Sequence, residues 1–323
     1  MKTFNELRKN LKKNFSGLTS LRVAVLGDTT TQFLVQALRG AGFDHMLDLK
    51  IWEADFDQIE NQVYDAGSDL YNHNPEVIII FHSTHKLLDR FNKLSSQDYK
   101  LFAQTQLTSV SAMHEKLTST VSAKIIYYNY NEINDAVFGS YSAKTESSFV
   151  FQLRKLNYEL MLFSLNTPNF YLCDLSTIQN QSGKFNFFQP SIYIHSEMAL
   201  SLAVLPQVAN RTLDIIDALT GKSKKCLILD LDNTVWGGII GDDGIEHIQI
   251  GYLGILSTLL SQLATKTEIS SSFNTISGWA RNGSFAIDSV FLLQTQMIMP
   301  LFFNFLTHCW ISVKALPIPK YPI

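Results

Sequence analysis

The chain has 323 residues, enough for about two globular domains, and 46% hydrophobic against 17% charged residues is a globular composition. A formal net charge of −3, without a basic stripe of interleaved aromatic residues, argues against a nucleic-acid partner. Three widely spaced cysteines, Cys173, Cys226 and Cys309, are typical of a reducing compartment and argue against a disulfide framework or zinc site, so we expect a cytoplasmic protein.

The N-terminal segment is basic and has no apolar core of the kind that a secretion signal needs. Leu7, Leu11 and Phe15 recur every four residues, which predicts a short amphipathic helix within residues 1–20. We favour packing of this helix onto the next domain; attachment to a membrane surface is the alternative.

From residue 21 onward, apolar runs typical of strands alternate with stretches typical of helices. The expected strands are 22–27, 47–52, 76–81, 123–130, 171–175 and 226–231. Such alternation predicts a parallel sheet buried between two layers of helices. We expect residues 21–222 to form a complete three-layer α/β domain, with the next domain beginning at about residue 223.

The first expected strand ends in Gly-Asp-Thr-Thr-Thr at residues 27–31, which resembles the Gly-Asp-Ser block of SGNH hydrolases. Thr29 stands where that family has its nucleophilic serine, and no Asp-x-x-His occurs in the chain. We favour an ordinary helix N-cap built from these residues. The functional alternative is a binding pocket lined by Asp28 and Thr29, rather than an esterase site.

Two histidines, His82 and His85, follow the third expected strand. Ligands of α/β proteins collect at this edge of the sheet, so His82 is a candidate to line a pocket together with Asp28. A histidine held in place for purely structural reasons is the interpretation that we favour.

A stronger candidate site is the sequence Asp-Leu-Asp-Asn-Thr at residues 230–234, which follows an apolar run. Asp230 and Asp232 are expected at the tip of a strand. Two bare carboxylates so close together would repel each other, so the pair predicts a bound cation facing an electrophile such as phosphate. Aspartates that cap the next helix or turn are the alternative.

The stretch 224–251, with Gly-Asp-Asp-Gly at 241–244, resembles the first motif of the FkbH-like branch of the haloacid dehalogenase (HAD) superfamily. The resemblance implies that Asp230 is a nucleophile that forms an aspartyl-phosphate and that Asp232 is the general acid and base. It also implies Mg²⁺ bound at Asp230 and Asp232, and a role for Thr234 in holding the loop or the phosphate.

The segment 255–323 differs in character from everything before it. It begins where the family likeness ends, and the last 72 positions, from Tyr252 onward, hold only six charged residues. The phosphate-binding Ser or Thr, the lysine and the acidic pair that complete a HAD site are not recognisable there. A frameshift near residue 255 is the favoured explanation. A membrane anchor at 289–313 is the alternative, although several polar side chains inside that run argue against it.

Taken with both resemblances, the sequence implies an SGNH- or flavodoxin-like parallel-sheet domain followed by the start of a Rossmann-like HAD domain at 223–254. The implied activity is a Mg²⁺-dependent phosphatase or a phosphoryl or acyl transferase, acting on a small phosphorylated substrate. In polyketide-type pathways the implied acceptor is an acyl carrier protein. The competing hypothesis is a non-catalytic or truncated binding protein.

Overall fold

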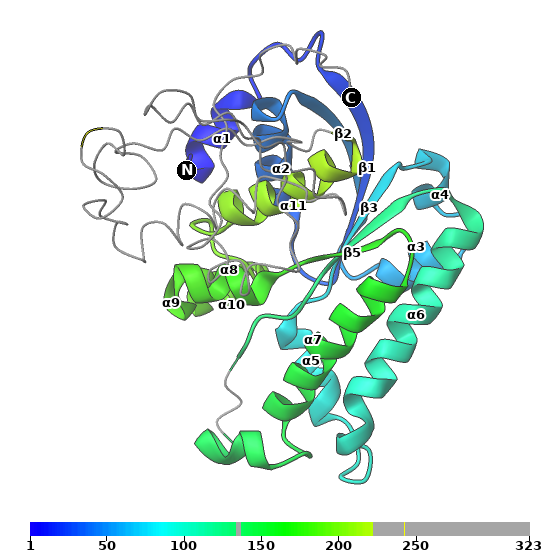
Figure 1. Ribbon diagram of the computed structural model, residues 1–323, viewed down its shortest axis with the longest axis vertical. Helices are drawn as coiled ribbons and strands as arrows, with labels where there is room; N and C mark the ends of the chain where they lie inside the picture. The colour runs from blue at the N-terminus through cyan, green and yellow to red at the C-terminus, as the bar shows by residue number, and fades with distance from the viewer. Residues whose placement is uncertain (134–136, 222–241, 243–323) are drawn as a thin grey trace. The chain divides into compact units, whose positions relative to one another are not determined.

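The computed structural model describes residues 1–133, 137–221 and 242 (Figure 1). Residues Met1–Ile216 form one compact unit. The expected strand at 226–231, the motif at 230–234 and the segment 255–323 lie outside the described residues. The described helices include none that is both long enough and apolar enough to cross a membrane, and the alternative anchor at 289–313 lies outside the described part.

A parallel sheet of five strands forms the centre of the described unit, in the order β2-β1-β3-β4-β5. The strands are β1 Thr19–Gly27, β2 Leu47–Glu53, β3 Val77–Phe81, β4 Lys124–Tyr128 and β5 Phe170–Cys173. This order is that of flavodoxin-like doubly wound folds, and the predicted three-layer α/β class is confirmed. The winding reverses between β1 and β3, so a ligand crevice is expected at the carboxyl ends of those two strands.

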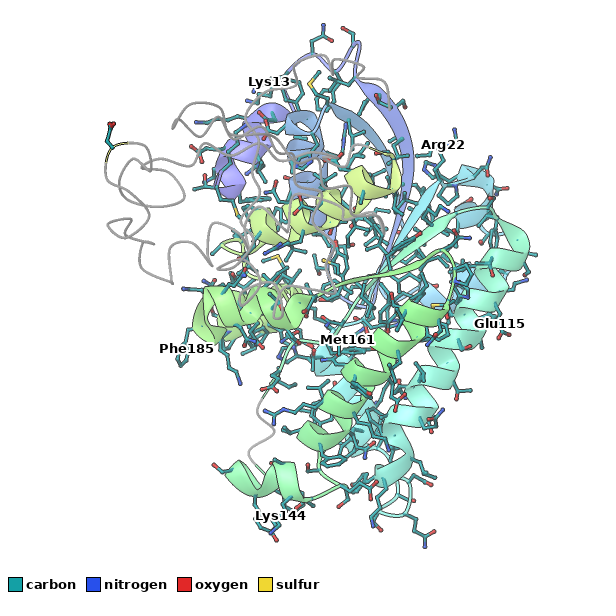
Figure 2. All side chains as sticks on the ribbon, in the orientation of Figure 1. Lys13, Arg22, Glu115, Lys144, Met161 and Phe185 are labelled. Carbon is teal, nitrogen blue, oxygen red and sulfur yellow. The ribbon has the colours of Figure 1, made fainter. Side chains whose placement is uncertain are left out.

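Helices cover both faces of the sheet (Figure 1). Their bounds are α1 Phe4–Asn10, α2 Gln32–Asp44, α3 Ile59–Tyr64, α4 Asp69–His73, α5 Thr84–Asn92, α6 Phe102–Thr120, α7 Phe149–Asn166, α8 Leu175–Ser182, α9 Lys184–Phe187, α10 Pro190–Ser196 and α11 Leu205–Leu219. One apolar core lies under α1, α2, α8 and α11, and a second lies under α3 to α7. Side chains such as Phe185 on α9 project outward (Figure 2).

Strand β3 shows why the sequence folds this way. Its residues Val-Ile-Ile-Ile-Phe are all buried, because alternate side chains enter the two cores. Val77, Ile79 and Phe81 lie in the core under α2, whereas Ile78 and Ile80 lie in the core under α6. Each such side chain contributes roughly 1.5–3 kcal/mol on burial. A continuous apolar run therefore fits only a strand covered on both faces.

The predicted N-terminal helix is present but shorter than expected. It begins at a capping box of Thr3 and Glu6 and ends at Asn10, so the prediction that it continues to Phe15 is wrong. The helix packs on α2, where Asn10 Nδ2 donates a hydrogen bond to the carbonyl oxygen of Gly40 over 2.8 Å. The favoured interpretation, packing onto the first domain, is confirmed.

Several strand boundaries also differ from prediction, and the first strand, β1, begins at Thr19 rather than at residue 22. Strand β4 ends at Tyr128 rather than at residue 130, and β5 ends at Cys173 rather than at residue 175. The cause at β5 is a helix start, because Asp174 accepts a hydrogen bond from the N–H of Thr177 and caps α8. Polar capping of the next helix thus ends the strand before its apolar pattern ends.

Candidate functional site

Polar side chains meet at the carboxyl ends of β1 and β3, where the winding of the sheet reverses. The N–H of Asp28 donates to the carbonyl oxygen of Phe81 over 3.2 Å, which fixes the ends of the two strands side by side. The Asp28 carboxylate then accepts the N–H of Ser83 over 2.7 Å. As expected for neighbouring parallel strands, this edge brings Asp28 and the residues after β3 together.

The Asp28 carboxyl group is 1% exposed, and its second oxygen lies 3.4 Å from Nη2 of Arg90 on α5. Burial raises the pKa of Asp28 to about 6, against the opposing effects of the Ser83 N–H and of the Arg90 and Lys86 cations. The group is therefore largely ionised at neutral pH and protonated in mild acid. A buried carboxyl group tuned in this way is typical of functional sites, although ion-pair networks also produce it.

His82 is buried directly after β3, next in sequence to Ser83, whose N–H bonds the Asp28 carboxylate. Its Nδ1 lies 3.0 Å from the Tyr127 hydroxyl, which lies 2.7 Å from the Tyr130 hydroxyl. Burial, together with the nearby Arg90 cation, lowers the pKa of His82 to about 3, so the ring is neutral at ordinary pH. A neutral ring fixed by a tyrosine can orient a ligand, and it does not act as a proton acceptor at pH 7.

The threonines after Asp28 join β1 to other parts of the domain. The hydroxyl of Thr29 donates to the carbonyl oxygen of Glu197 and accepts the N–H of Ala199 over 3.2 Å. Thr30 donates to the carbonyl oxygen of Ser196, and Thr31 donates to Oε1 of Glu53 over 2.6 Å. The Thr29 hydroxyl is thus engaged with main-chain groups, as expected of a structural residue rather than a nucleophile.

The helix-cap interpretation of these residues is correct in position but wrong in its hydrogen bonds. Thr31 occupies the N-cap position of α2, but its side chain makes no capping bond and reaches Glu53 instead. Asp28 instead accepts the N–H of Ser83, the residue that precedes a different helix, α5. The carboxylate therefore links two strands of the sheet instead of capping the helix that follows it.

Sequence reasoning missed Ser83 and Arg90, both of which contact Asp28. No sequence pattern marks these contacts, because Ser83 donates its main-chain N–H and Arg90 reaches Asp28 from the last turn of α5. His85, one residue into α5, does not contact Asp28 in the structure. Its ring packs against those of Phe188 and Tyr193, with centroid distances of 4.2 and 4.6 Å, and these two rings also contact each other.

Asp230, Asp232 and Thr234 lie outside the described residues. Within residues 1–133, 137–221 and 242, no cluster of three or more His, Cys, Asp or Glu side chains could hold a metal ion. Cys173 is buried on β5, where burial raises the pKa of its thiol to about 12, as expected of a packing residue.

Comparison with solved structures identifies a close relative. The chain is similar to the N-terminal part of the protein BF1531 from Bacteroides fragilis, whose crystal structure is described as containing a phosphatase domain complexed with Mg. The two share 44% sequence identity with a TM-score of 0.74, over 81% of this chain and 71% of the other.

Weaker likenesses are to TesA, with 12% identity and a TM-score of 0.41, and to the acetyl xylan esterase AlAXEase, with 11% identity and a TM-score of 0.39. They cover 61% of this chain and 99% and 100% of the other chains, respectively. Scores this low carry no argument about activity. A search of curated proteins gave no match.

The family comparison covers most of the described unit. The model of the FkbH N-terminal domain matches residues 22–217, which begin within β1 and end within α11. That match extends over more than half of the chain and agrees with the relative from Bacteroides fragilis. The chain therefore belongs to the FkbH family, and its described part is the N-terminal domain of that family.

Proposed function

We propose that this chain is a Mg²⁺-dependent phosphotransfer enzyme of the HAD type, with Asp230 as nucleophile and Asp232 as general acid and base. The observation that supports it best is the motif at 230–234 in a chain 44% identical to a protein whose structure is described as a phosphatase domain with Mg. A small phosphorylated molecule is the proposed substrate, and an acyl carrier protein is a proposed acceptor. The widely spaced cysteines support a cytoplasmic location.

The donor atoms of the motif suit the proposed metal. Asp230 and Asp232 offer carboxylate oxygens, which are the hard ligands that Mg²⁺ prefers. Bound there, Mg²⁺ would neutralise negative charge on the phosphoryl group as it is transferred.

The proposed reaction has two steps. A carboxylate oxygen of Asp230 attacks phosphorus, the bond to the leaving oxygen breaks, and Asp232 gives that oxygen a proton. Asp232 then takes a proton from the water that attacks the phosphorus of the aspartyl-phosphate; the bond between phosphorus and the Asp230 oxygen breaks, inorganic phosphate leaves and the Asp230 carboxylate is restored. Thr234 is proposed to contact the phosphate or hold the loop.

The N-terminal domain is proposed to bind rather than to hydrolyse. The Thr29 hydroxyl, at the position of the SGNH nucleophile, contacts main-chain groups of the loop after α10. His82 is neutral and hydrogen-bonded to a tyrosine. These contacts support a binding role for the SGNH-like domain around Asp28, and they argue against an esterase.

A second candidate function is a non-catalytic binding protein. It is favoured by the sequence of residues 252–323, where the later pieces of a HAD site are not recognisable. In this case the folded N-terminal domain would carry all of the function. Hydrolysis of a phosphate ester separates the two candidates.

The test measures hydrolysis of p-nitrophenyl phosphate with Mg²⁺ and with EDTA, for the unmodified chain and for Asp230→Asn. We expect hydrolysis only with Mg²⁺, and a loss of at least about a thousandfold in Asp230→Asn, because an amide cannot act as the nucleophile. Asp55→Asn, at an exposed position of the first domain, is the matched control and should retain activity. Hydrolysis that survives in Asp230→Asn would refute the nucleophile, and inactivity of the unmodified chain would favour the binding protein.

A further inference from the structure

The start of the chain concentrates positive charge on a protein that is otherwise acidic. Up to residue 13 the only acidic side chain is Glu6, and the basic side chains are Lys2, Arg8, Lys9, Lys12 and Lys13. The whole chain has a formal net charge of −3, so the residues after Lys13 are on balance acidic. Charge that is separated in this way along a chain indicates a negatively charged partner for the basic end.

Helix α1 holds the basic segment on a fixed base. Phe4 and Leu7 are buried in the core that α1 shares with α2, and Asn10 bonds the carbonyl oxygen of Gly40 over 2.8 Å. The two helices approach so closely that a Cβ atom at Gly40 would lie 2.4 Å from the Leu7 carbonyl oxygen. The apolar side of α1 is thus used inside the domain and is not available for insertion into a membrane.

The end of α1 and the turns after it carry four exposed cations that make no salt bridge with any described residue. We call this set the basic surface, and its members are Arg8, Lys9, Lys12 and Lys13. Acidic groups near it have other partners. Asp44 pairs with Lys2 over 2.5 Å, and the Glu6 carboxylate accepts the N–H and the hydroxyl of Thr3. Most of the positive charge of the basic surface is therefore unbalanced within the domain.

Aromatic rings of the domain support two members of the basic surface. The Arg8 guanidinium lies 5.8 Å from the centre of the Phe4 ring, and Lys13 Nζ lies 4.7 Å from the centre of the Phe43 ring. Such contacts restrict the two side chains while their charges remain exposed to water. Side chains that are restricted in advance lose less freedom when a partner binds.

We propose that the basic surface binds an acidic face of a partner protein. Its cations lie on successive turns rather than around one point, which suits several carboxylates spread over a surface. The acidic remainder of the chain would repel an extended polyanion such as DNA or an anionic membrane, whereas a compact protein can meet the basic surface alone. The surface belongs to the N-terminal domain, and binding there does not depend on phosphoryl transfer at Asp230.

The experiment measures binding of the full chain to a model of an acidic protein face. The probe is a fluorescein-labelled helical peptide built from the repeat Glu-Ala-Ala-Glu, and fluorescence anisotropy is the readout. We expect saturable binding that weakens as salt is added, because exposed charges are screened. A peptide with glutamine in place of glutamate should not bind.

A pair of double variants separates the basic surface from net charge. Lys9→Glu combined with Lys12→Glu should weaken binding at least about tenfold, because two attractive charges become repulsive. Lys93→Glu combined with Lys144→Glu is the matched control, since both lysines are exposed and the net charge changes equally. Lys144 lies at the opposite end of the described unit from Lys13 (Figure 2), so this control should keep most of the affinity. Equal urea midpoints of the two variants would show that a loss of binding is not a loss of folding.

The outcomes decide the proposal. Equal weakening in both double variants would show that only net charge matters and would overturn it, as would the absence of saturable peptide binding. Phosphatidylglycerol vesicles and duplex DNA are titrated in parallel. Tighter binding of either one than of the peptide would assign the basic surface to a membrane or a nucleic acid and would also overturn the proposal. Since phosphate-ester hydrolysis is not a readout, this result is separate from the test of Asp230.

Discussion

The carboxylate of Asp28 accepts the main-chain N–H of Ser83 over 2.7 Å and joins the end of β1 to the start of α5. This contact lies where the sheet reverses its winding, at the position where doubly wound proteins bind ligands. The carboxyl group is nearly inaccessible to water, and Arg90 is its nearest cation. The domain therefore keeps a buried charge at neutral pH, which costs stability and indicates a role beyond packing.

Asp28→Asn should increase the free energy of unfolding at pH 7, because asparagine keeps an oxygen for the Ser83 N–H and carries no charge to bury. The pKa of Asp28 is about 6 in the folded protein and 3.8 in the reference state. The folded state thus binds the proton more tightly, so the stability contributed by this group falls as pH rises from about 4 to about 6. The resulting loss at pH 7 is on the order of 1–3 kcal/mol.

Urea unfolding of both proteins across this pH range checks the prediction. The advantage of Asp28→Asn should grow between about pH 4 and pH 6 and then remain constant. A difference that does not vary with pH would show that the ion pair with Arg90 compensates fully for burial.

Tyr127→Phe should destabilise the domain by about 1–3 kcal/mol, because it removes a buried hydroxyl that contacts both His82 and Tyr130. Tyr158→Phe, at a 55% exposed position of α7, is the matched control and should change stability by less than about 0.5 kcal/mol. Urea unfolding at pH 7 measures both effects. Equal stability of the two variants would contradict a structural role for the hydroxyl.

His82 itself should not titrate in the folded protein above about pH 4. Burial lowers its pKa to about 3, below the reference value of 6.5, so the unfolded state binds the proton more tightly. Stability contributed by His82 is therefore complete above pH 6.5 and is lost as pH falls toward 3, the reverse of the effect at Asp28. The Hε1 resonance of His82 in NMR spectra should stay constant between about pH 5 and pH 8. A shift in that range would show that the ring takes up a proton.

Thr29→Val should destabilise the domain by about 1–3 kcal/mol, because it leaves the carbonyl of Glu197 and the N–H of Ala199 without the hydroxyl. Thr29→Ser keeps the hydroxyl and should lose less. Comparison of the two midpoints in urea separates the hydrogen bonds from the methyl group. If Thr29→Ser and Thr29→Val destabilise the domain equally, the hydroxyl contributes nothing and packing of the threonine methyl group is responsible.

The three-layer arrangement can be predicted from the sequence. A strand that is buried on both faces needs apolar side chains at every position, and residues 77–81 form such a continuous apolar run. The placement of Asp28 near His82 follows as well, since carboxyl ends of neighbouring parallel strands share an edge. The bond between Asp28 and Ser83 does not follow. It depends on the register of β1 against β3, with Gly27 opposite Phe81, which no local pattern specifies.

Long-range contacts explain the other failures. Thr29 meets Glu197 across 168 positions of the chain, a pairing that periodicity cannot reveal. At the N-terminus, the four-residue spacing of apolar side chains correctly indicated that these side chains are covered, but it incorrectly predicted that the helix continues to Phe15. Phe15 packs edge to face on Phe43, with ring centroids 5.3 Å apart, although the helix ends at Asn10. An apolar period reports which side chains are covered, and turns after a helix can cover them equally well.

Gly40→Ala should separate α1 from α2. A Cβ atom at Gly40 would lie 2.4 Å from the carbonyl oxygen of Leu7, which is main chain and cannot move aside without moving the helix. Overpacking of this kind costs about 1–3 kcal/mol. It should also disturb the hydrogen bond from Asn10 to the Gly40 carbonyl.

Gly67→Ala is the matched control, because its Cβ would make only an ordinary contact of 3.5 Å with the Asp65 side chain. Hydrogen exchange should be faster in the α1 amides of Gly40→Ala alone, and unchanged protection there would show that the helix does not depend on this close approach.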